Sequence, residues 1–221
     1  NDKAFTREAG NSITLTQDDL SPVEGKDWEY SGAVYCVLTY EGCSLTTDTV
    51  TVTFNTCTHE KYTSDGTCRQ CGAKCSDTIA YIEEDGTAYG IAEDSTSSHS
   101  FQGSSGGTYY FVRDVQRTIN MGNNDISVGS EDVILDLQGH SIWRLELGNF
   151  PYKTVTIKNG SVDIITTDEA AVVVLENVTL KEEMEFDENF DLTVKGDCVF
   201  EKMVTFSGTT HLQGGTFNDS I

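Results

Sequence analysis

The sequence predicts an all-β protein whose C-terminal part is a right-handed parallel β-helix. Valine, threonine and isoleucine recur in short runs, and the 221 residues include 20 glycines but only two prolines. This composition is typical of short strands joined by turns. An internal repeat with a period of 18 to 20 residues also runs through the second half of the chain. Such a period fits one coil of a β-helix, in which like residues of successive coils stack into a continuous core.

Five segments carry this repeat, and without gaps they lie 20, 18, 19 and 18 residues apart. They are Leu135–Ile142, Val155–Val162, Val173–Leu180, Leu192–Val199 and Thr210–Phe217. Apolar residues at the first and third positions would share the inner face of a strand. The eighth position is apolar again and would begin the next inward-facing strand.

Two positions of the repeat define the expected core and the expected turn. The third position is aliphatic in all copies: Leu137, Ile157, Leu175, Val194 and Leu212. The fifth position is glycine or asparagine in all copies: Gly139, Asn159, Asn177, Gly196 and Gly214. Glycine and asparagine tolerate the left-handed backbone of a tight bend, so we expect each coil to turn there.

The chain divides into three expected regions: a β segment over 1–55, a cysteine-rich module over 56–78, and the β-helix over 79–221. In the first region we expect strands over 12–16, 33–40 and 49–54. Tyr30–Cys36 and the closing strand Thr49–Phe54 resemble the end of a bacterial immunoglobulin-like domain. Tyr35 adjoins Cys36 directly, which departs from that pattern, and a small β-sheet packed on its neighbour is the alternative. Cys36 and Cys43 flank six residues, a spacing that suits a hairpin closed by a disulfide.

The cysteine-rich module contains a metal-binding pattern. Cys68 and Cys71 are separated by two residues and followed by Gly72, which allows both sulfurs to face one ion. Cys57 and His59 could supply the other two ligands of a structural zinc ion. Two alternatives remain open: two disulfides among the four cysteines of this segment, and Cys75 as a ligand in place of Cys57 or His59. The pattern C-x-H…G-x-C-x-x-C-G is similar to a module of surface proteins from gut Firmicutes.

The repeat region also resembles a family. Val133–Ile142 is similar to the "LDLNGHTI" line of pectate-lyase-like β-helix domains in gut Firmicutes surface proteins, and Tyr110–Val115 is similar to the segment that precedes it. The resemblance covers roughly residues 80–217. It implies the fold and an extracellular or cell wall-attached location. It does not define an activity, because this fold hosts lyases, hydrolases, adhesins and inert stalks.

Charge and hydropathy exclude two classes of partner. The chain has 14 basic and 36 acidic residues, a net charge of −22, which repels nucleic acid and anionic lipid. No apolar run reaches membrane length, and no signal peptide opens the sequence. We therefore expect neither nucleic-acid binding nor membrane insertion of this segment, and we expect an export signal and any wall anchor to lie outside it.

The repeat aligns few groups that could catalyse a reaction. We expect Asp136 and Asp197 to be the acidic residues on strand or turn positions, and they lie three coils apart at different positions. A glycosidase needs two carboxylates about 5 to 10 Å apart. We therefore expect a protein that is not an enzyme.

The expected ligand contacts are aromatic residues: Trp143, Phe150 and Tyr152. Such side chains could stack on a sugar or anchor a protein. The expected function is adhesin-like recognition of a host ligand, such as a mucin glycan or a secreted protein like immunoglobulin. The alternatives are a polysaccharide lyase or glycoside hydrolase of the β-helix class, and a passive structural stalk.

Overall fold

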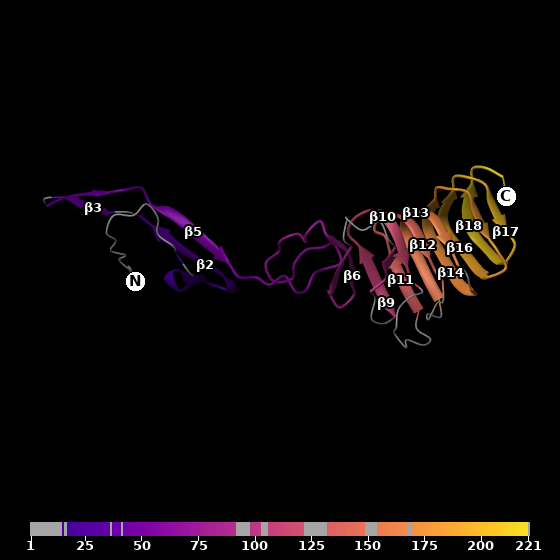
Figure 1. Cartoon of the computed structure of the whole chain (residues 1–221), viewed down its shortest axis with the longest axis horizontal. Helices are drawn as coiled ribbons and strands as arrows, with labels where there is room; N and C mark the ends of the chain where they lie inside the picture. Colours follow the sequence, from indigo (N-terminus) through magenta and orange to yellow (C-terminus); the bar gives the residue numbers. More distant parts are fainter. Residues whose placement is uncertain are drawn as a thin grey trace. The chain divides into compact units, whose positions relative to one another are not determined.

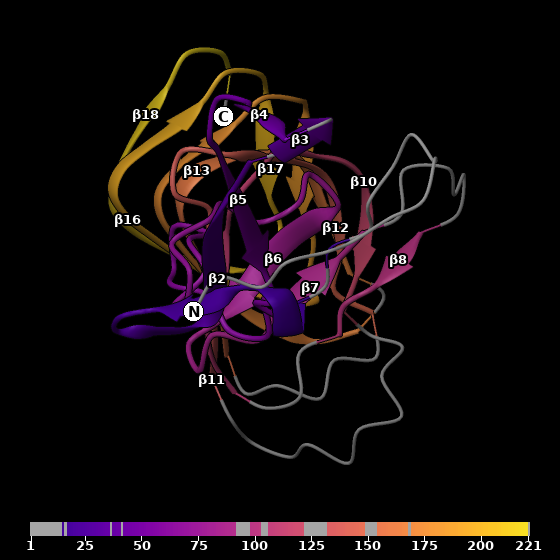
Figure 2. The same ribbon diagram turned by 90° about the vertical axis from the view of Figure 1, so that its left-hand side faces the viewer.

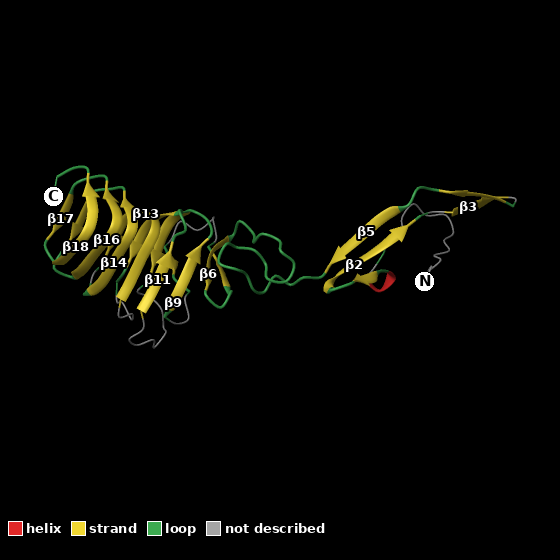
Figure 3. Ribbon diagram, turned by 180° about the vertical axis from the view of Figure 1, so that it is seen from behind, coloured by secondary structure: helices red, strands yellow, loops and turns green. Residues whose placement is uncertain are grey.

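The computed structural model describes residues 15, 17–35, 37–40, 42–91, 98–102, 106–121, 132–148, 154–167 and 169–220. The chain forms two compact units, which divide after Thr58. Among the described residues every regular element is a strand, except for one 3-10 turn, η1 (Gln17–Asp19) (Figure 3). The all-β prediction is confirmed. No helix in the described segments is long and apolar enough to cross a bilayer.

The N-terminal unit contains a three-stranded antiparallel sheet and a separate hairpin. The sheet has the order β1 (Ser21–Val23), β2 (Lys26–Val34), β5 (Val50–Asn55), and the hairpin pairs β3 (Val37–Tyr40) with β4 (Cys43–Thr46). The strand expected over 49–54 is therefore confirmed as β5. The segment expected as one strand over 33–40 is instead the end of β2 followed by β3. An immunoglobulin sandwich has two packed sheets of seven or more strands in total, and the described residues of this unit do not show that arrangement.

The second unit, His59–Ile221, contains the β-helix. Its strands are β6 (Ile79–Glu83), β7 (Ala88–Gly90), β8 (His99–Ser100), β9 (Gly107–Phe111), β10 (Val115–Asn120), β11 (Asp132–Asp136), β12 (Ser141–Glu146), β13 (Thr154–Thr166), β14 (Ala171–Leu180), β15 (Met184–Phe186), β16 (Phe190–Phe200), β17 (Val204–Phe206) and β18 (Thr209–Phe217). Figure 1 shows these strands stacked side by side, from β9 in magenta to β18 in yellow.

Parallel pairing between coils builds this stack. One side follows the order β9-β11-β13-β14-β16-β18, and a second side continues through β8, β10, β12 and β13. Figure 2 places β16 and β18 on one side of the coils and β10 and β12 on the other. β15 pairs with β17 in a third, shorter ladder. The predicted parallel β-helix is confirmed, with about five turns.

The first coil departs from the gapless alignment. Leu135, not Leu137, pairs with Ile157, so the expected register of this strand is wrong by two residues. Register is restored at Ser141, which pairs with Ser161 as expected. The difference arises because the first coil makes a wider turn between its two strands than the next coil does. Leu137 is still fully buried.

A smaller shift occurs in β16. Leu180 pairs with Phe200 and not with Val199, because β16 has a one-residue irregularity after Lys195–Gly196 relative to β14. Phe200 is 1 % exposed, whereas Val199 is half-buried. Phe217 of β18 pairs with the same Phe200. The expected inward position at Val199 is therefore wrong, since a one-residue shift turns a strand residue to the opposite face.

The expected left-handed turns form in four of the five copies. Gly139, Asn159, Asn177 and Gly196 have φ values of 89°, 58°, 55° and 65°. In the last copy the positive φ, 106°, belongs to Gly215 and not to Gly214. Short polar side chains extend the turns: Asn159 Nδ2 donates to Asp136 Oδ1 at 3.1 Å, and Asn177 Nδ2 donates to Asn159 Oδ1 at 3.4 Å. The turns of neighbouring coils are thus bonded to each other.

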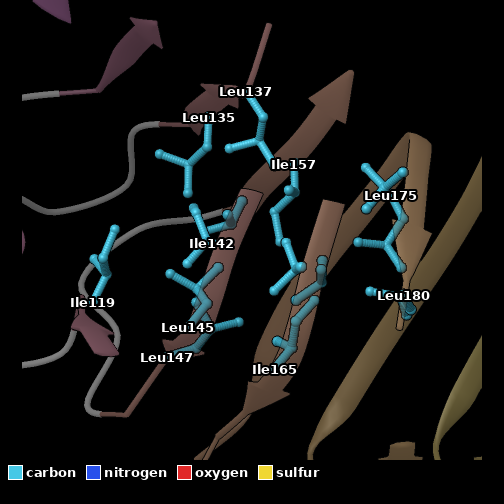
Figure 4. Packing of buried hydrophobic residues seen from close by; sticks show 14 of the residues in the cluster. Ile119, Leu135, Leu137, Ile142, Leu145, Leu147, Ile157, Ile165, Leu175 and Leu180 are labelled. Carbon is cyan, nitrogen blue, oxygen red and sulfur yellow. The ribbon is translucent and has the colours of Figure 1, made fainter. Parts of the chain in front are cut away.

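A single core runs through the coils up to β17. On the last strand, β18, the expected core position Leu212 is 50 % exposed, so this expectation is wrong for the final copy. In the middle the core is aliphatic, and Figure 4 shows Leu135, Ile157 and Leu175 pointing inward from consecutive coils. Aromatic rings fill both ends. At the start they are Tyr81, Tyr89, Phe101, Tyr109 and Phe111. At the other end they are Phe186, Phe190, Phe200, Phe206 and Phe217.

Substitution in the middle of the core tests this packing. Leu175→Ala should lower the free energy of unfolding of the β-helix by about 3 kcal/mol, because it leaves a cavity between two buried neighbours. Its neighbour Val174 points outward on the same strand, so Val174→Ala should cost less than about 1 kcal/mol. Urea unfolding followed by circular dichroism measures both. Equal losses for the two variants would contradict the assigned register.

Candidate functional site

The cysteine-rich module is built from tight turns with little regular structure. Its backbone is closed by two antiparallel bridges, Tyr62 with Cys68 and Thr67 with Lys74. The turn after Cys68 is fixed by two hydrogen bonds, since Gly72 N donates to Cys68 O at 2.9 Å and Cys68 N donates to Ala73 O at 2.8 Å. Gly72 has a φ of 74°, a conformation in which a side chain would be strained.

The turns bring four potential ligands together. The ligand atoms of Cys57, His59, Cys68 and Cys71 all lie within 4.8 Å of one another, and Cys71 Sγ is 3.5 Å from His59 Nδ1. Tetrahedral zinc sites with bonds of about 2.0 to 2.3 Å place neighbouring ligand atoms about 3.3 to 3.8 Å apart. Cys68 is buried and the other three residues are half-buried. This cluster could hold a metal ion, and it is the set of residues that the sequence predicted.

The backbone of His59 is unusual. Its φ is 54°, in the left-handed region that non-glycine residues occupy uncommonly. Strained backbone of this kind concentrates at functional sites, where the surrounding structure holds a side chain in a required position. In this conformation the imidazole of His59 lies within 4.8 Å of three cysteine sulfurs. The sequence gives no signal for this conformation.

Cys75 is not part of the cluster. It packs behind Gly66, where a side chain at position 66 would come within 2.8 Å of the Cys75 sulfur. Burial raises the pKa of the Cys75 thiol above its usual value, which favours the neutral form. Cys71 and Cys75 are free, so the structure does not contain the arrangement in which all four cysteines of this segment form two disulfides.

The other expected sites are only partly described. β3 and β4 form the expected hairpin, and Cys43 lies opposite Tyr40 in it. Cys36 lies outside the described residues, so the Cys36–Cys43 disulfide stays a prediction. Phe150 and Tyr152 also lie outside the described residues. Trp143 on β12 is 42 % exposed, whereas the neighbouring Ile142 is fully buried, so the indole is available on the surface as expected.

The structure also contains a row of charged residues that is not apparent when the five repeat segments are aligned without gaps. Asp136, Lys158, Glu176 and Lys195 are consecutive partners on the outer face of β11, β13, β14 and β16. Their charges alternate, and Lys158 Nζ lies 3.4 Å from Asp136 Oδ2. The expectation that Asp136 and Asp197 are the only acidic residues at such positions is wrong, because Glu176 is the fourth residue of the aligned segment Val173–Leu180. The observed register also places Glu176 in the same row as Asp136.

The cysteine-rich module is attached to the first coil by polar contacts. Gln138 Nε2 donates to Ser64 O at 2.8 Å and to Phe111 O at 2.9 Å. Lys61 Nζ lies 2.6 Å from Asp85 Oδ2 in the turn between β6 and β7. Tyr62 N also donates to Gly86 O at 2.9 Å. The module therefore covers the end of the stack where β6 and β7 close the sheet with antiparallel pairs.

The chain was compared with protein-family models, with curated proteins and with solved structures, and none of them matches it.

Metal removal tests the cluster. The purified chain should bind one divalent metal ion per molecule, and chelation should lower the free energy of unfolding of the second unit. Metal-free protein should be about 4 kcal/mol less stable than protein kept at a free metal concentration of about 1,000 times the Kd. Cys68→Ser should abolish binding, whereas Cys75→Ser should retain it. Elemental analysis and thermal unfolding measure these effects, and metal-free protein with sulfur–sulfur bonds among Cys57, Cys68 and Cys71 would contradict the assignment.

The Lys61–Asp85 contact makes a pH-dependent contribution. Hydrogen bonds from Lys61 and then Thr87 lower the pKa of Asp85 to about 2. The folded state therefore favours the carboxylate, so its contribution is present above about pH 4 and is lost as the pH falls towards 2. Because the pair is exposed, the effect should be small. Thermal unfolding between pH 2 and pH 5 should show a shallower acid dependence for Asp85→Asn than for the wild type, and Glu188→Gln should behave like the wild type.

Proposed function

We propose that this chain is a secreted or cell-surface bacterial binding protein without catalytic activity. It recognises a host ligand, such as a mucin glycan or a secreted protein like immunoglobulin. The observation that carries the proposal is the contrast between Trp143, which is exposed on β12, and Asp136, whose carboxylate is paired with a cation and with turn donors. Exposed aromatic side chains are the groups most often used to anchor a sugar or a protein partner.

Two carboxylates of the coils, those of Asp136 and Asp163, lie close to lysine side chains. Asp136 lies 3.4 Å from Lys158 and accepts hydrogen bonds from the amide of Asn159 and the backbone of Gln138. Asp163 lies 3.7 Å from Lys181. A general acid or a nucleophile needs an oxygen that can reach the substrate. These two carboxylates support the fold of the turns and of the outer face, which favours a scaffold over an enzyme.

One arrangement favours the enzyme alternative. Asp136 and Glu176 lie in one row two coils apart, a separation of about 9 to 10 Å that approaches the spacing of an inverting glycosidase. Lys158 stands between them and pairs with Asp136. A cation in that place occupies the position where the attacked sugar would lie. Release of reducing or unsaturated sugar ends from polysaccharides would support a hydrolase or a lyase and contradict the proposal.

The cluster of the cysteine-rich module fits zinc best. Three thiolates and one imidazole form a donor set of structural zinc sites, and soft sulfur ligands disfavour calcium and magnesium. Four protein ligands leave no open position for substrate. Zinc would therefore hold the module in its folded form at the first coil, with Cys57, His59, Cys68 and Cys71 as ligands, and would take no part in binding the host ligand.

Binding measurements test the proposal. The chain should bind at least one of three targets: mucin, a glycan array or immunoglobulin. Trp143→Ala should weaken binding about tenfold or more, because a stacked aromatic contact is lost. Val172→Ala is the matched control, since Val172 is similarly exposed at 40 % on β14, and it should bind normally. Absence of binding to all three targets would contradict the proposal.

A further inference from the structure

An irregularity in the β-helix lies beside Trp143. Val115 pairs with Ile142 and Thr118 with Arg144, so β10 places two residues, Gln116 and Arg117, opposite Trp143 alone. An extra residue in one strand locally breaks the ladder and redirects the side chains next to it. At this point two polar side chains are brought to the side of an exposed indole.

The same segment lines a hollow in the surface with a volume of about 290 Å³. Its lining residues are Ile91, Arg113, Asp114, Val115, Gln116 and Arg117. The volume is large enough for a single sugar ring but small for a larger ligand.

The charged side chains around the hollow differ in whether they already have hydrogen-bond or ion-pair partners. Asp114 Oδ1 accepts a hydrogen bond from Ser141 N at 2.8 Å and lies 3.6 Å from His140 Nδ1. Arg113 is held by the backbone, since its Nη2 donates to Ile91 O at 2.9 Å. Within the described segments no hydrogen bond or ion pair engages the guanidinium of Arg117, although the chain carries a net charge of −22. The hollow therefore presents an available cation while its carboxylate is already bonded.

We infer that this hollow binds a sugar unit that bears a carboxylate, as part of the proposed recognition of a glycan. The Arg117 guanidinium can hold a carboxylate through two parallel hydrogen bonds. Trp143 is not among the residues that line the hollow. It lies opposite Gln116 and Arg117 in the ladder, so a sugar held by Arg117 can extend from the hollow onto its exposed indole. Gln116 can bond to ring hydroxyls. A neutral sugar would use the indole but would leave the guanidinium without a partner.

Fluorescence titration tests this inference. In the Trp28→Phe background Trp143 is the only tryptophan, so its emission reports binding at this place. The probes are sialyllactose and trigalacturonate, which carry carboxylates, and lactose, which does not. At least one carboxylated probe should bind about tenfold more tightly than lactose, and raised salt should weaken it. The preference between the two carboxylated probes identifies a sialic acid or a uronic acid as the sugar.

Two arginine variants separate this inference from the broader proposal. Arg117→Gln should weaken the binding of the carboxylated probe about tenfold. Arg144→Gln removes the same charge from the residue next to Trp143, but that guanidinium already pairs with Glu146 at 3.0 Å, so binding should change less than about twofold. Equal binding of lactose, or an unaffected Arg117→Gln, would overturn the inference and leave binding through Trp143 standing. No binding of these probes, of mucin or of immunoglobulin would overturn both.

Discussion

In a parallel β-helix every coil is hydrogen-bonded to the coil before it, about 4.8 Å away, and the rest of this structure depends on that register. Leu135, Ile157, Leu175 and Val194 form one inward row because their strands are paired residue by residue. A change of one residue turns a side chain from the core to the surface. The turns absorb differences in coil length, and the bonded side chains of Asp136, Asn159 and Asn177 hold them in line.

The stack of coils has two ends. Three structural features cover the end formed by β6 and β7. β6 and β7 change the pairing from parallel to antiparallel and end the sheet with a strand of three residues, and such a short edge strand is a poor template for another chain. Aromatic rings fill the core beneath them, and the cysteine-rich module covers the outside through Gln138 and Lys61. A module this small buries little apolar surface of its own. A metal ion held by its four clustered ligands would supply the stability that the module lacks.

The outer face follows from the same register. Pairing places Asp136, Lys158, Glu176 and Lys195 in one alternating row, so neighbouring coils attract each other at the surface. Within this row Lys158 Nζ lies 3.4 Å from Asp136 Oδ2. The ladder is interrupted at β10, where Gln116 and Arg117 lie opposite Trp143 alone.

The sequence by itself determined the class of fold and the four residues whose cluster could hold a metal ion. The repeat of 18 to 20 residues is a strong sequence signal because every coil packs the same kinds of residue at the same positions. The spacing of Cys68, Cys71 and Gly72 is a strong signal because two sulfurs must reach one ion. The sequence could not determine where coils differ in length. The wide turn before Ser141, the extra residue in β16 and the irregularity of β10 depend on pairing between distant strands. Only the tertiary structure decided that Asp136 shares a row with Glu176, that Cys75 lies outside the cluster, and that β10 places two residues opposite Trp143. Each of these depends on how segments pair or pack in the folded chain.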